Sequence, residues 1–259
     1  MHVMKLLSLE GKVALVIGGA GLYGVQITEA LAEAGATTYV TTRQKDKLAE
    51  LEKQFEERGV RATALYLDQS DESTILDARD DLLAREGRID VLVNNAVGRI
   101  DGMEWNADTS KFAESMQVNA TGIYALTKIF GNVMQERKSG SIIQIASMQG
   151  MIGPDAWLYG GKVAVPPDYF FHKGGMINFT RYAAGYYGQD NVRCNCISPG
   201  GIQSHRTPPD FVERYSTRTM LNRMANDTDL KGIVVFLASD ASAYVTGANI
   251  PVDGGYTAK

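Results

Sequence analysis

A tyrosine and a lysine four positions apart, Tyr169 and Lys173, are the side chains of this chain best suited to proton transfer. On a helix, residues i and i+4 share one face, so the phenol and the ammonium can reach the same site. A free tyrosine has a pKa of about 10, and a nearby cation lowers that pKa because it favours the phenolate. The pair therefore predicts a general acid or base that works near neutral pH.

A second motif is rich in glycine and follows the first apolar run of the chain. Gly18, Gly21 and Gly24 have the spacing G-x-x-G-x-x-G between an expected strand and an expected helix. Glycine permits a tight turn there and lets backbone N–H groups approach a pyrophosphate at the helix N-terminus. A plain strand-to-helix turn is the alternative, but the position directly after the first strand favours a dinucleotide site.

The ends of the next two expected strands bear on which dinucleotide would bind. A carboxylate after the second strand would accept the adenosine ribose hydroxyls of NAD, but the sequence there is Thr41-Thr42-Arg43. Arg43 could instead bind the 2′-phosphate of NADP, so NADP(H) is preferred over NAD(H); a solvated surface charge is the alternative. Asp68, after the third strand, could accept from the adenine amino group or serve as a cap or turn carboxylate.

These residues need a scaffold, and alternating strand-like and helix-like segments indicate a parallel sheet with helices on both faces. The expected strands are 12–17, 37–42, 61–67, 89–93, 141–146, 192–197 and 245–252, and the expected helices are 26–34, 45–58, 71–85, 110–136, 169–187 and 227–237. Ligands of such sheets bind outside the carboxyl ends of the strands. The singled-out residues that follow strand ends are Gly18, Asp68, Asn95, Ser147 and Pro199.

Composition narrows the class of protein further. A chain of 259 residues suffices for a single domain over 1–259. A formal net charge of −4 offers no polycation for nucleic acid, and no apolar run approaches the roughly 20 residues of a membrane span. The N-terminus has no signal-peptide pattern. We therefore expect a cytoplasmic protein that binds a small molecule and neither nucleic acid nor a membrane.

Cysteine and histidine offer little to redox or metal chemistry. Cys194 and Cys196 are expected on one face of a strand, where a disulfide would be strained, so they are predicted to be buried reduced thiols. The histidines, His2, His172 and His205, are scattered and form no zinc-type cluster. No metal is expected.

In combination, the motifs resemble the short-chain dehydrogenase/reductase family over essentially the whole chain. The segments that carry the resemblance are Asn94-Asn95-Ala96, Asn119, Ser147, Tyr169-x-x-x-Lys173, Val192-Arg193-Cys194-Asn195, Ser198-Pro199-Gly200-Gly201 and Val252-Asp253-Gly254-Gly255. The resemblance implies an α/β fold, a single-domain Rossmann-type doubly wound parallel sheet of seven strands in the order 3-2-1-4-5-6-7. It also implies a nicotinamide cofactor, carbonyl/alcohol chemistry and a homotetramer.

The resemblance assigns roles to residues as well. Tyr169 would be the general acid or base for the substrate oxygen, Lys173 would hold the nicotinamide ribose, and Ser147 would orient the substrate oxygen. Asn119 would position a water in a proton relay to Lys173. The implied cofactor contacts are Gly18, Gly21, Tyr23, Gly24, Arg43, Asp68, Asn95, Ala96, Lys173, Pro199, Gly200, Ile202 and Ser204. The hydride chemistry itself belongs to the cofactor.

The chain departs from the family pattern around the first glycine. Ile17 stands where threonine is usual, which removes a hydroxyl that braces the turn, and Leu22 occupies the position of the usual middle glycine. We expect a turn that is altered in detail and still competent to bind. His172, where serine is common, has no assigned role.

The catalytic tyrosine has a competitor. Ser147 and Tyr169 are 22 positions apart, farther than is usual in the family, and Tyr159 lies nearer the usual distance. The lysine that follows Tyr159 is Lys162, at i+3, and the two glycines after Tyr159 begin a helix poorly. Tyr169 is therefore preferred, and the extra residues are expected to form a longer substrate-side loop, with a surface excursion as the alternative.

The expected substrate-side loops are 148–168 and 203–222. Their polar and aromatic residues are Asp155, Trp157, Tyr159, Lys162, His205, Arg206, Arg214 and Arg218. Such groups suit a hydroxylated or acidic molecule, and relatives with a similar loop act in carbohydrate metabolism, so a sugar, sugar acid or polyol is the hypothesis. A 3-oxoacyl or steroid-like ketone is the alternative, because an apolar cleft could form from Met148, Met151, Ile152 and Trp157. A non-catalytic NADP(H) sensor or scaffold and a redox-neutral reaction stay open.

Overall fold

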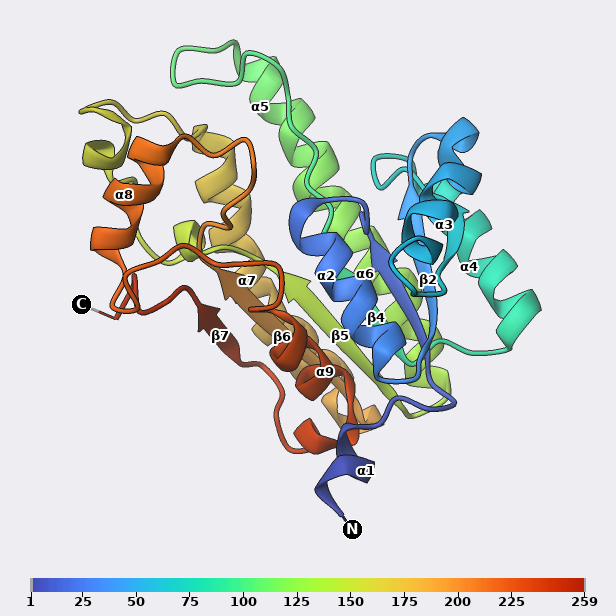
Figure 1. Ribbon diagram of the computed structural model, residues 1–259. Helices are drawn as coiled ribbons and strands as arrows, with labels where there is room; N and C mark the ends of the chain where they lie inside the picture. The colour runs from blue at the N-terminus through green and yellow to red at the C-terminus, as the bar shows by residue number, and fades with distance from the viewer. Residues whose placement is uncertain (1, 259) are drawn as a thin grey trace.

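The computed structural model describes residues 2–258. These residues fold around one seven-stranded sheet with the strand order β3-β2-β1-β4-β5-β6-β7 (Figure 1). The strands are β1 Val13–Ile17, β2 Thr37–Thr42, β3 Thr63–Tyr66, β4 Val91–Asn94, β5 Gly140–Ile145, β6 Val192–Pro199 and β7 Asn249–Val252. All neighbouring strands are parallel. The predicted doubly wound order is confirmed.

Helices cover both faces of this sheet (Figure 1). They are α1 Val3–Leu7, α2 Leu22–Glu33, α3 Leu48–Glu56, α4 Glu72–Glu86, α5 Thr109–Met116, α6 Gly122–Glu136, α7 Pro167–Tyr187, α8 Pro209–Arg218 and α9 Lys231–Ala238. Strand β1 shows why there are two layers: Val13 and Leu15 pack into the core under α4, α6 and α7, whereas Ala14 and Val16 pack into the core under α2 and α9. Successive side chains of a strand point to opposite faces, so an all-apolar strand is buried on both.

The expected helix 110–136 exists but is interrupted. It is α5, then a π-helical turn, η2 Gln117–Thr121, then α6. The turn contains Asn119, which is 3% exposed. An inserted π turn rotates the side chains that follow it, and such turns are frequent at functional sites. Apolar periodicity predicts the extent of this helix and carries no signal for the insertion.

Residues 203–222 contain a helix that the sequence analysis did not predict. It is α8, and the Pro208-Pro209 pair at its start explains it, because proline is favoured in the first turn of a helix. The expectation of a loop over this whole range is therefore wrong. The thiols of Cys194 and Cys196 are free and buried, as predicted.

Residues 148–168 and helix α8 form one packed unit on the left of Figure 1. Their shared small core contains Met148, Leu158, Tyr215, Met224 and Tyr256. Polar contacts reinforce it, since Arg218 forms an ion pair with Asp155 at 2.9 Å and Arg214 donates to the Leu158 carbonyl oxygen at 3.0 Å. We call residues 148–168 together with α8 the side unit.

Over residues 2–258, no helix is both long enough and apolar enough to cross a membrane.

Candidate active site

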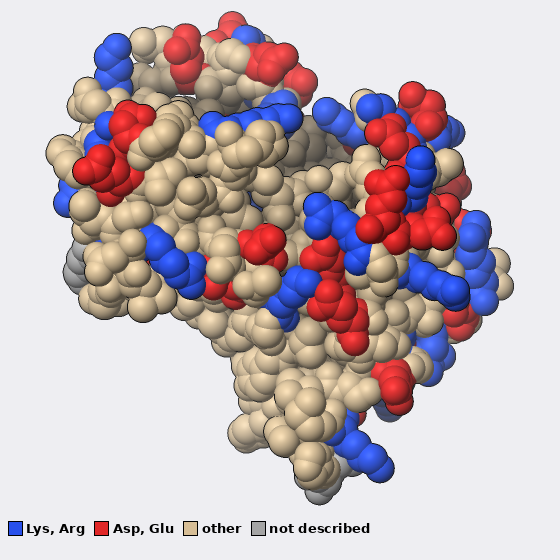
Figure 2. All heavy atoms as spheres, viewed as in Figure 1, with Lys and Arg blue, Asp and Glu red and all other residues tan. Residues whose placement is uncertain are grey.

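A cavity of about 610 Å³ lies where β1, β2 and β4 end. The predicted site residues that line it are Gly18, Gly21, Tyr23, Arg43, Asp68, Asn95, Ala96, Tyr169, Gly200 and Ile202. The structure thus brings the predicted dinucleotide residues and the predicted acid/base into one space. Figure 2 shows a hollow in the upper part of this face, with blue cationic side chains along its rim.

The glycine turn is tight for a steric reason. A Cβ on Gly18, whose φ is +76°, would lie 2.7 Å from the Cβ of Ala96, and a Cβ on Gly24 would lie 2.3 Å from the Gly18 carbonyl oxygen. Gly19, which the motif analysis did not single out, is equally constrained, because its Cβ would lie 1.9 Å from a methyl of Val40. At Gly21 the nearest atom would be 3.6 Å away, an ordinary contact.

Two side chains brace this turn. The Thr41 hydroxyl accepts a hydrogen bond from the Gly18 amide at 3.1 Å, and the Asn95 amide donates to the Gly18 carbonyl oxygen at 2.8 Å. Thr41 belongs to β2, so the neighbouring strand supplies a hydroxyl to a turn that lacks one at Ile17. The altered motif therefore keeps a braced turn.

The positive end of helix α2 is open to this cavity. Its N-cap, Gly21, has no side chain to cap the first N–H groups, and no acidic side chain lies in the first turn. Free N–H groups and the helix dipole suit an anion such as a pyrophosphate. The Tyr23 hydroxyl donates to the Gly200 carbonyl oxygen at 2.8 Å and so links α2 to the end of β6.

The far end of the cavity carries Arg43 and Asp68. Arg43 is exposed and forms no ion pair within residues 2–258. Asp68 uses Oδ1 to accept from the amide and hydroxyl of Ser70, at 2.9 and 2.7 Å, so it is a turn carboxylate as well as a lining residue. These groups and the glycine turn line one cavity that can hold a dinucleotide.

The electrostatics of Tyr169 differ from the sequence expectation. Burial raises the pKa of Tyr169, while Ser147 and the cation of Arg99 act in the opposite direction. Lys173 does not deliver the expected lowering, because its Nζ donates to the Ile145 carbonyl oxygen at 2.6 Å and lies 5.8 Å from the centre of the Tyr169 ring. Burial also lowers the pKa of Lys173 to about 8.

Several predicted site residues do not line the cavity: Gly24, Asn119, Ser147, Lys173, Pro199 and Ser204. Ser147 follows β5 and its hydroxyl accepts from the Gln149 amide at 3.2 Å. The Asn119 side chain forms two hydrogen bonds with the backbone of Gly98. Its oxygen accepts from the Gly98 amide at 2.8 Å, and its nitrogen donates to the Gly98 carbonyl oxygen at 2.7 Å. Ser204 pairs with the Thr207 hydroxyl in a local turn.

Arg99 is a site residue that the sequence analysis missed. It lines the cavity together with Tyr169, is exposed, and forms no ion pair within residues 2–258. The signal for it was available, because Arg99 follows the same strand end as Asn95 and no acidic residue precedes it closely in the sequence.

Two arginines of the side unit are paired with carboxylates of the same unit. Arg214 is paired with Asp210 at 2.9 Å, and the guanidinium of Arg218 lies 4.5 Å from the centre of the Trp157 ring while it pairs with Asp155. Neither 148–168 nor 203–222 contributes a residue to the lining of the cavity that contains Tyr169.

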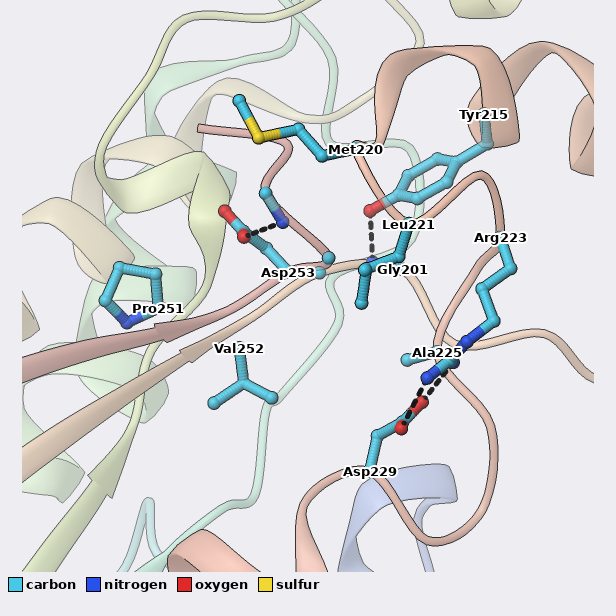
Figure 3. Close-up of a pocket in the computed structure, with 13 residues that line it drawn as sticks. Gly201, Tyr215, Met220, Leu221, Arg223, Ala225, Asp229, Pro251, Val252 and Asp253 are labelled. Carbon is cyan, nitrogen blue, oxygen red and sulfur yellow. Dashed lines mark hydrogen bonds and ion pairs between the residues drawn. The ribbon is translucent and has the colours of Figure 1, made fainter. Parts of the chain in front are cut away.

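A second cavity, of about 400 Å³, lies between α8 and the end of β7 (Figure 3). Its polar side chains are already partnered: Arg223 with Asp229, Tyr215 with the Gly201 amide, and Asp253 with the Gly255 amide. No group of three or more His, Cys, Asp or Glu in the described part of the chain could hold a metal ion. The chemistry therefore concentrates in the first cavity.

Replacing Arg43 by alanine is expected to weaken NADPH binding about tenfold and to change NADH binding less than twofold, because only NADPH presents a phosphate dianion. Fluorescence titration of both cofactors measures the two constants. Lys45→Ala is the matched control, since its ammonium lies 4.4 Å from the centre of the Tyr66 ring and does not line the cavity. Equal losses for both cofactors would contradict a phosphate-specific role.

Comparison with known proteins gives consistent matches over nearly the whole chain. A family model described as enoyl-(acyl carrier protein) reductase matches residues 21–257. The NADP-dependent mannitol dehydrogenase of Aureobasidium melanogenum is 32% identical over 99% of this chain and 96% of its own. The 3-oxoacyl-acyl-carrier-protein reductase of Thermotoga maritima is 30% identical over 95% and 98%.

Among solved structures, the gluconate 5-dehydrogenase of Burkholderia cenocepacia, in complex with NADP and tartrate, matches with a TM-score of 0.86 and 29% identity, covering 100% of both chains.

Proposed function

Because the chain belongs to the short-chain dehydrogenase/reductase family of NAD(P)-dependent enzymes that act on alcohols and carbonyls, we propose that its substrate is a hydroxylated acid or polyol of the sugar type. The observation that carries the substrate class is Arg99, a cation that shares the cavity with Tyr169 and has no ion-pair partner within residues 2–258. Guanidinium binds carboxylate in a bidentate geometry and binds hydroxyls as a multiple donor.

The proposed mechanism uses the residues around Tyr169. The nicotinamide ring, when bound, supplies or accepts the hydride. In ketone reduction the Tyr169 hydroxyl gives its proton to the substrate oxygen, and in alcohol oxidation the phenolate takes that proton back. Ser147 donates to the same substrate oxygen, and Lys173 holds positive charge behind the phenol. The glycine turn, the start of α2 and Arg43 would hold the two phosphate regions of the cofactor.

The apolar residues that the sequence offers for an apolar cleft lie elsewhere in the structure. Met148 is buried in the core of the side unit, and Ile152 packs against that core. Trp157 lies beneath Arg218, and the Met151 sulfur is contacted by Asn249. These four residues were the candidates for an apolar cleft, and none of them lines the cavity that contains Tyr169.

We also propose NADP(H) as the preferred cofactor. Arg43 at the end of β2 supports it, and one relative is named as NADP-dependent while a solved neighbour holds NADP. A cytoplasmic location and a homotetramer are proposals of the same kind. Supporting the second, α7 presents an exposed aromatic stripe of Phe171, Tyr182 and Tyr186 that a copy of this chain could cover.

A panel assay tests the proposed function. Nicotinamide reduction is followed by absorbance with NAD and NADP over sugar acids, polyols, neutral sugars, simple secondary alcohols and a hydroxysteroid. We expect turnover of sugar acids with NADP. Turnover confined to the steroid and simple alcohols would overturn the substrate class, and cofactor binding without net turnover of any member would favour a sensor or a redox-neutral reaction.

The variant Arg99→Ala adds a residue-level test. Its KM for an acidic substrate is expected to rise about tenfold, with a smaller change for a neutral polyol, because a charge-assisted hydrogen bond is lost. Arg206→Ala is the matched control, since Arg206 is exposed and lies outside the cavity lining. Equal effects of Arg99→Ala on acidic and neutral substrates would show that Arg99 does not select the acid.

A further inference from the structure

A buried carboxylate directly precedes the proposed acid/base. Asp168 is 5% exposed and occupies the first turn of α7, one position before Tyr169. Its Oδ2 accepts a hydrogen bond from the Ser115 hydroxyl at 2.5 Å, and its Oδ1 has no hydrogen-bond partner within residues 2–258. Burying a carboxylate with an unsatisfied oxygen is unfavourable, so its presence beside the site calls for a reason.

Ser115 passes the connection on to the π-helical turn. It is 0% exposed, and its hydroxyl oxygen, while donating to Asp168, accepts from the Asn119 amide at 3.1 Å. The side-chain oxygen and nitrogen of Asn119 both form hydrogen bonds with the backbone of Gly98. The chain of hydrogen bonds therefore runs from α7 through α5 and η2 to the loop that follows β4.

That loop, residues 95–99, is part of the candidate site. Asn95 braces the glycine turn, and Ala96, Gly98 and Arg99 line the cavity. Asp168 and Gly98 are thus the two ends of one network, and each end is the immediate neighbour of a residue that faces the cavity, Tyr169 or Arg99. Misplacement of reacting groups by about 1 Å can cost a factor of 100 in rate, so such a network matters for orientation.

We propose that Asp168 is a positioning residue, which through Ser115 and Asn119 holds the loop 95–99 in place relative to Tyr169. This inference rests on the proposed function only in so far as Tyr169 is the acid/base of the reaction. Its structural content, a carboxylate that orders a loop it does not touch, can be tested without a substrate. Helices α5 and α7 also contact each other through the rings of Phe112 and Phe171, whose centres lie 5.5 Å apart. Loss of the carboxylate therefore leaves another contact between the two helices.

Hydrogen exchange of the Gly98 amide, which donates to Asn119, is the direct readout. In Asp168→Ala, exchange of this amide is expected to accelerate roughly tenfold, which corresponds to the loss of about one hydrogen bond. Ser115→Ala is expected to have the same effect, and the double variant no more than either, because all three interrupt one chain. Asp168→Asn keeps an acceptor for Ser115 and is expected to restore slow exchange.

Asp90→Ala is the matched control. Asp90 is a 4% exposed aspartate that accepts from the Val13 amide at 2.8 Å and pairs with Arg88, outside the lining of the cavity. Replacing it by alanine is expected to lower the melting temperature without changing exchange at Gly98. NADPH titration is the second readout, with about threefold weaker binding expected in Asp168→Ala and unchanged binding in Asp90→Ala.

Two results would overturn the proposal: Gly98 exchange in folded Asp168→Ala no faster than in Asp90→Ala, or additive effects of Asp168→Ala and Ser115→Ala. If Asp168→Ala does not fold, Ser115→Ala and Asp168→Asn carry the same comparison. Should the wild-type protein bind no NADPH, the proposed function fails, while Gly98 exchange still decides the network.

Discussion

Tyr169→Phe is expected to lose turnover by a factor of roughly 10³ while NADPH affinity stays within about twofold, because proton transfer supplies that order of rate and binding does not need it. The substitution removes one oxygen and leaves the ring, which packs edge-on against His172 at 5.3 Å. Burial lowers the pKa of His172 to about 3, so this neighbour is neutral and cannot replace the lost acid. Initial rates and fluorescence titration measure the two quantities.

Tyr159→Phe is the control for this result. Tyr159 is the other tyrosine that the spacing to Ser147 allows, but its ring packs on Phe211 at 5.4 Å in the side unit and does not line the cavity. Removal of its hydroxyl is expected to change turnover by less than about threefold, because this hydroxyl lies outside the cavity that contains Tyr169. The reverse outcome, loss of turnover with Tyr159→Phe alone, would move the acid/base role to Tyr159. Unchanged turnover in both variants would remove tyrosine from the mechanism.

Much of the fold could be predicted because its signals are local. Strand β1 is apolar at successive positions, which is readable as a strand buried on both faces, and Gly18 to Gly24 place a turn after it. The pairing of Tyr169 with Lys173 needs only the period of a helix. Each of these depends on residues close in the sequence, where backbone geometry fixes the outcome.

The rest depends on contacts between distant segments. Asp168 meets Ser115 across 53 positions, and the π turn that directs Asn119 toward Gly98 has no apolar signature. The charges of the side unit appear solvent-facing in the sequence, yet Arg218 and Asp155 neutralise one another. The predicted direction of the pKa shift of Tyr169 is also wrong. The spacing of Tyr169 and Lys173 shows that a cation is near, but it does not show how deeply the phenol is buried.

Lys173→Met is expected to raise the free energy of unfolding by about 1–3 kcal/mol at pH 7 while it reduces turnover at least about 100-fold. Lys173 is 2% exposed, and burial lowers its pKa from 10.5 to about 8. At pH 7 the ammonium is charged in both states, so the folded state bears a desolvation cost of about 3 kcal/mol at 1.36 kcal/mol per pKa unit. Methionine has a similar length and no charge, and it loses only the hydrogen bond to Ile145.

The lowered pKa of Lys173 also determines how the free energy of unfolding changes with pH. Below pH 8 the folded and unfolded states both bind the proton and the cost is complete. Between pH 8 and 10.5 the folded state releases the proton first, so the unfolding free energy of the wild-type protein rises with pH across this window. Denaturant titrations of the wild-type protein and Lys173→Met should therefore differ most below pH 8 and converge toward pH 10.5.

Lys162→Met serves as the reference, because Lys162 is exposed and forms no ion pair within residues 2–258. It should match the wild-type protein in stability and turnover at every pH. A Lys173→Met protein that is less stable than wild type at pH 7 would mean that the bond to Ile145 outweighs the burial of the charge. A more stable protein with little turnover would show that this lysine is kept buried for catalysis at the expense of the fold.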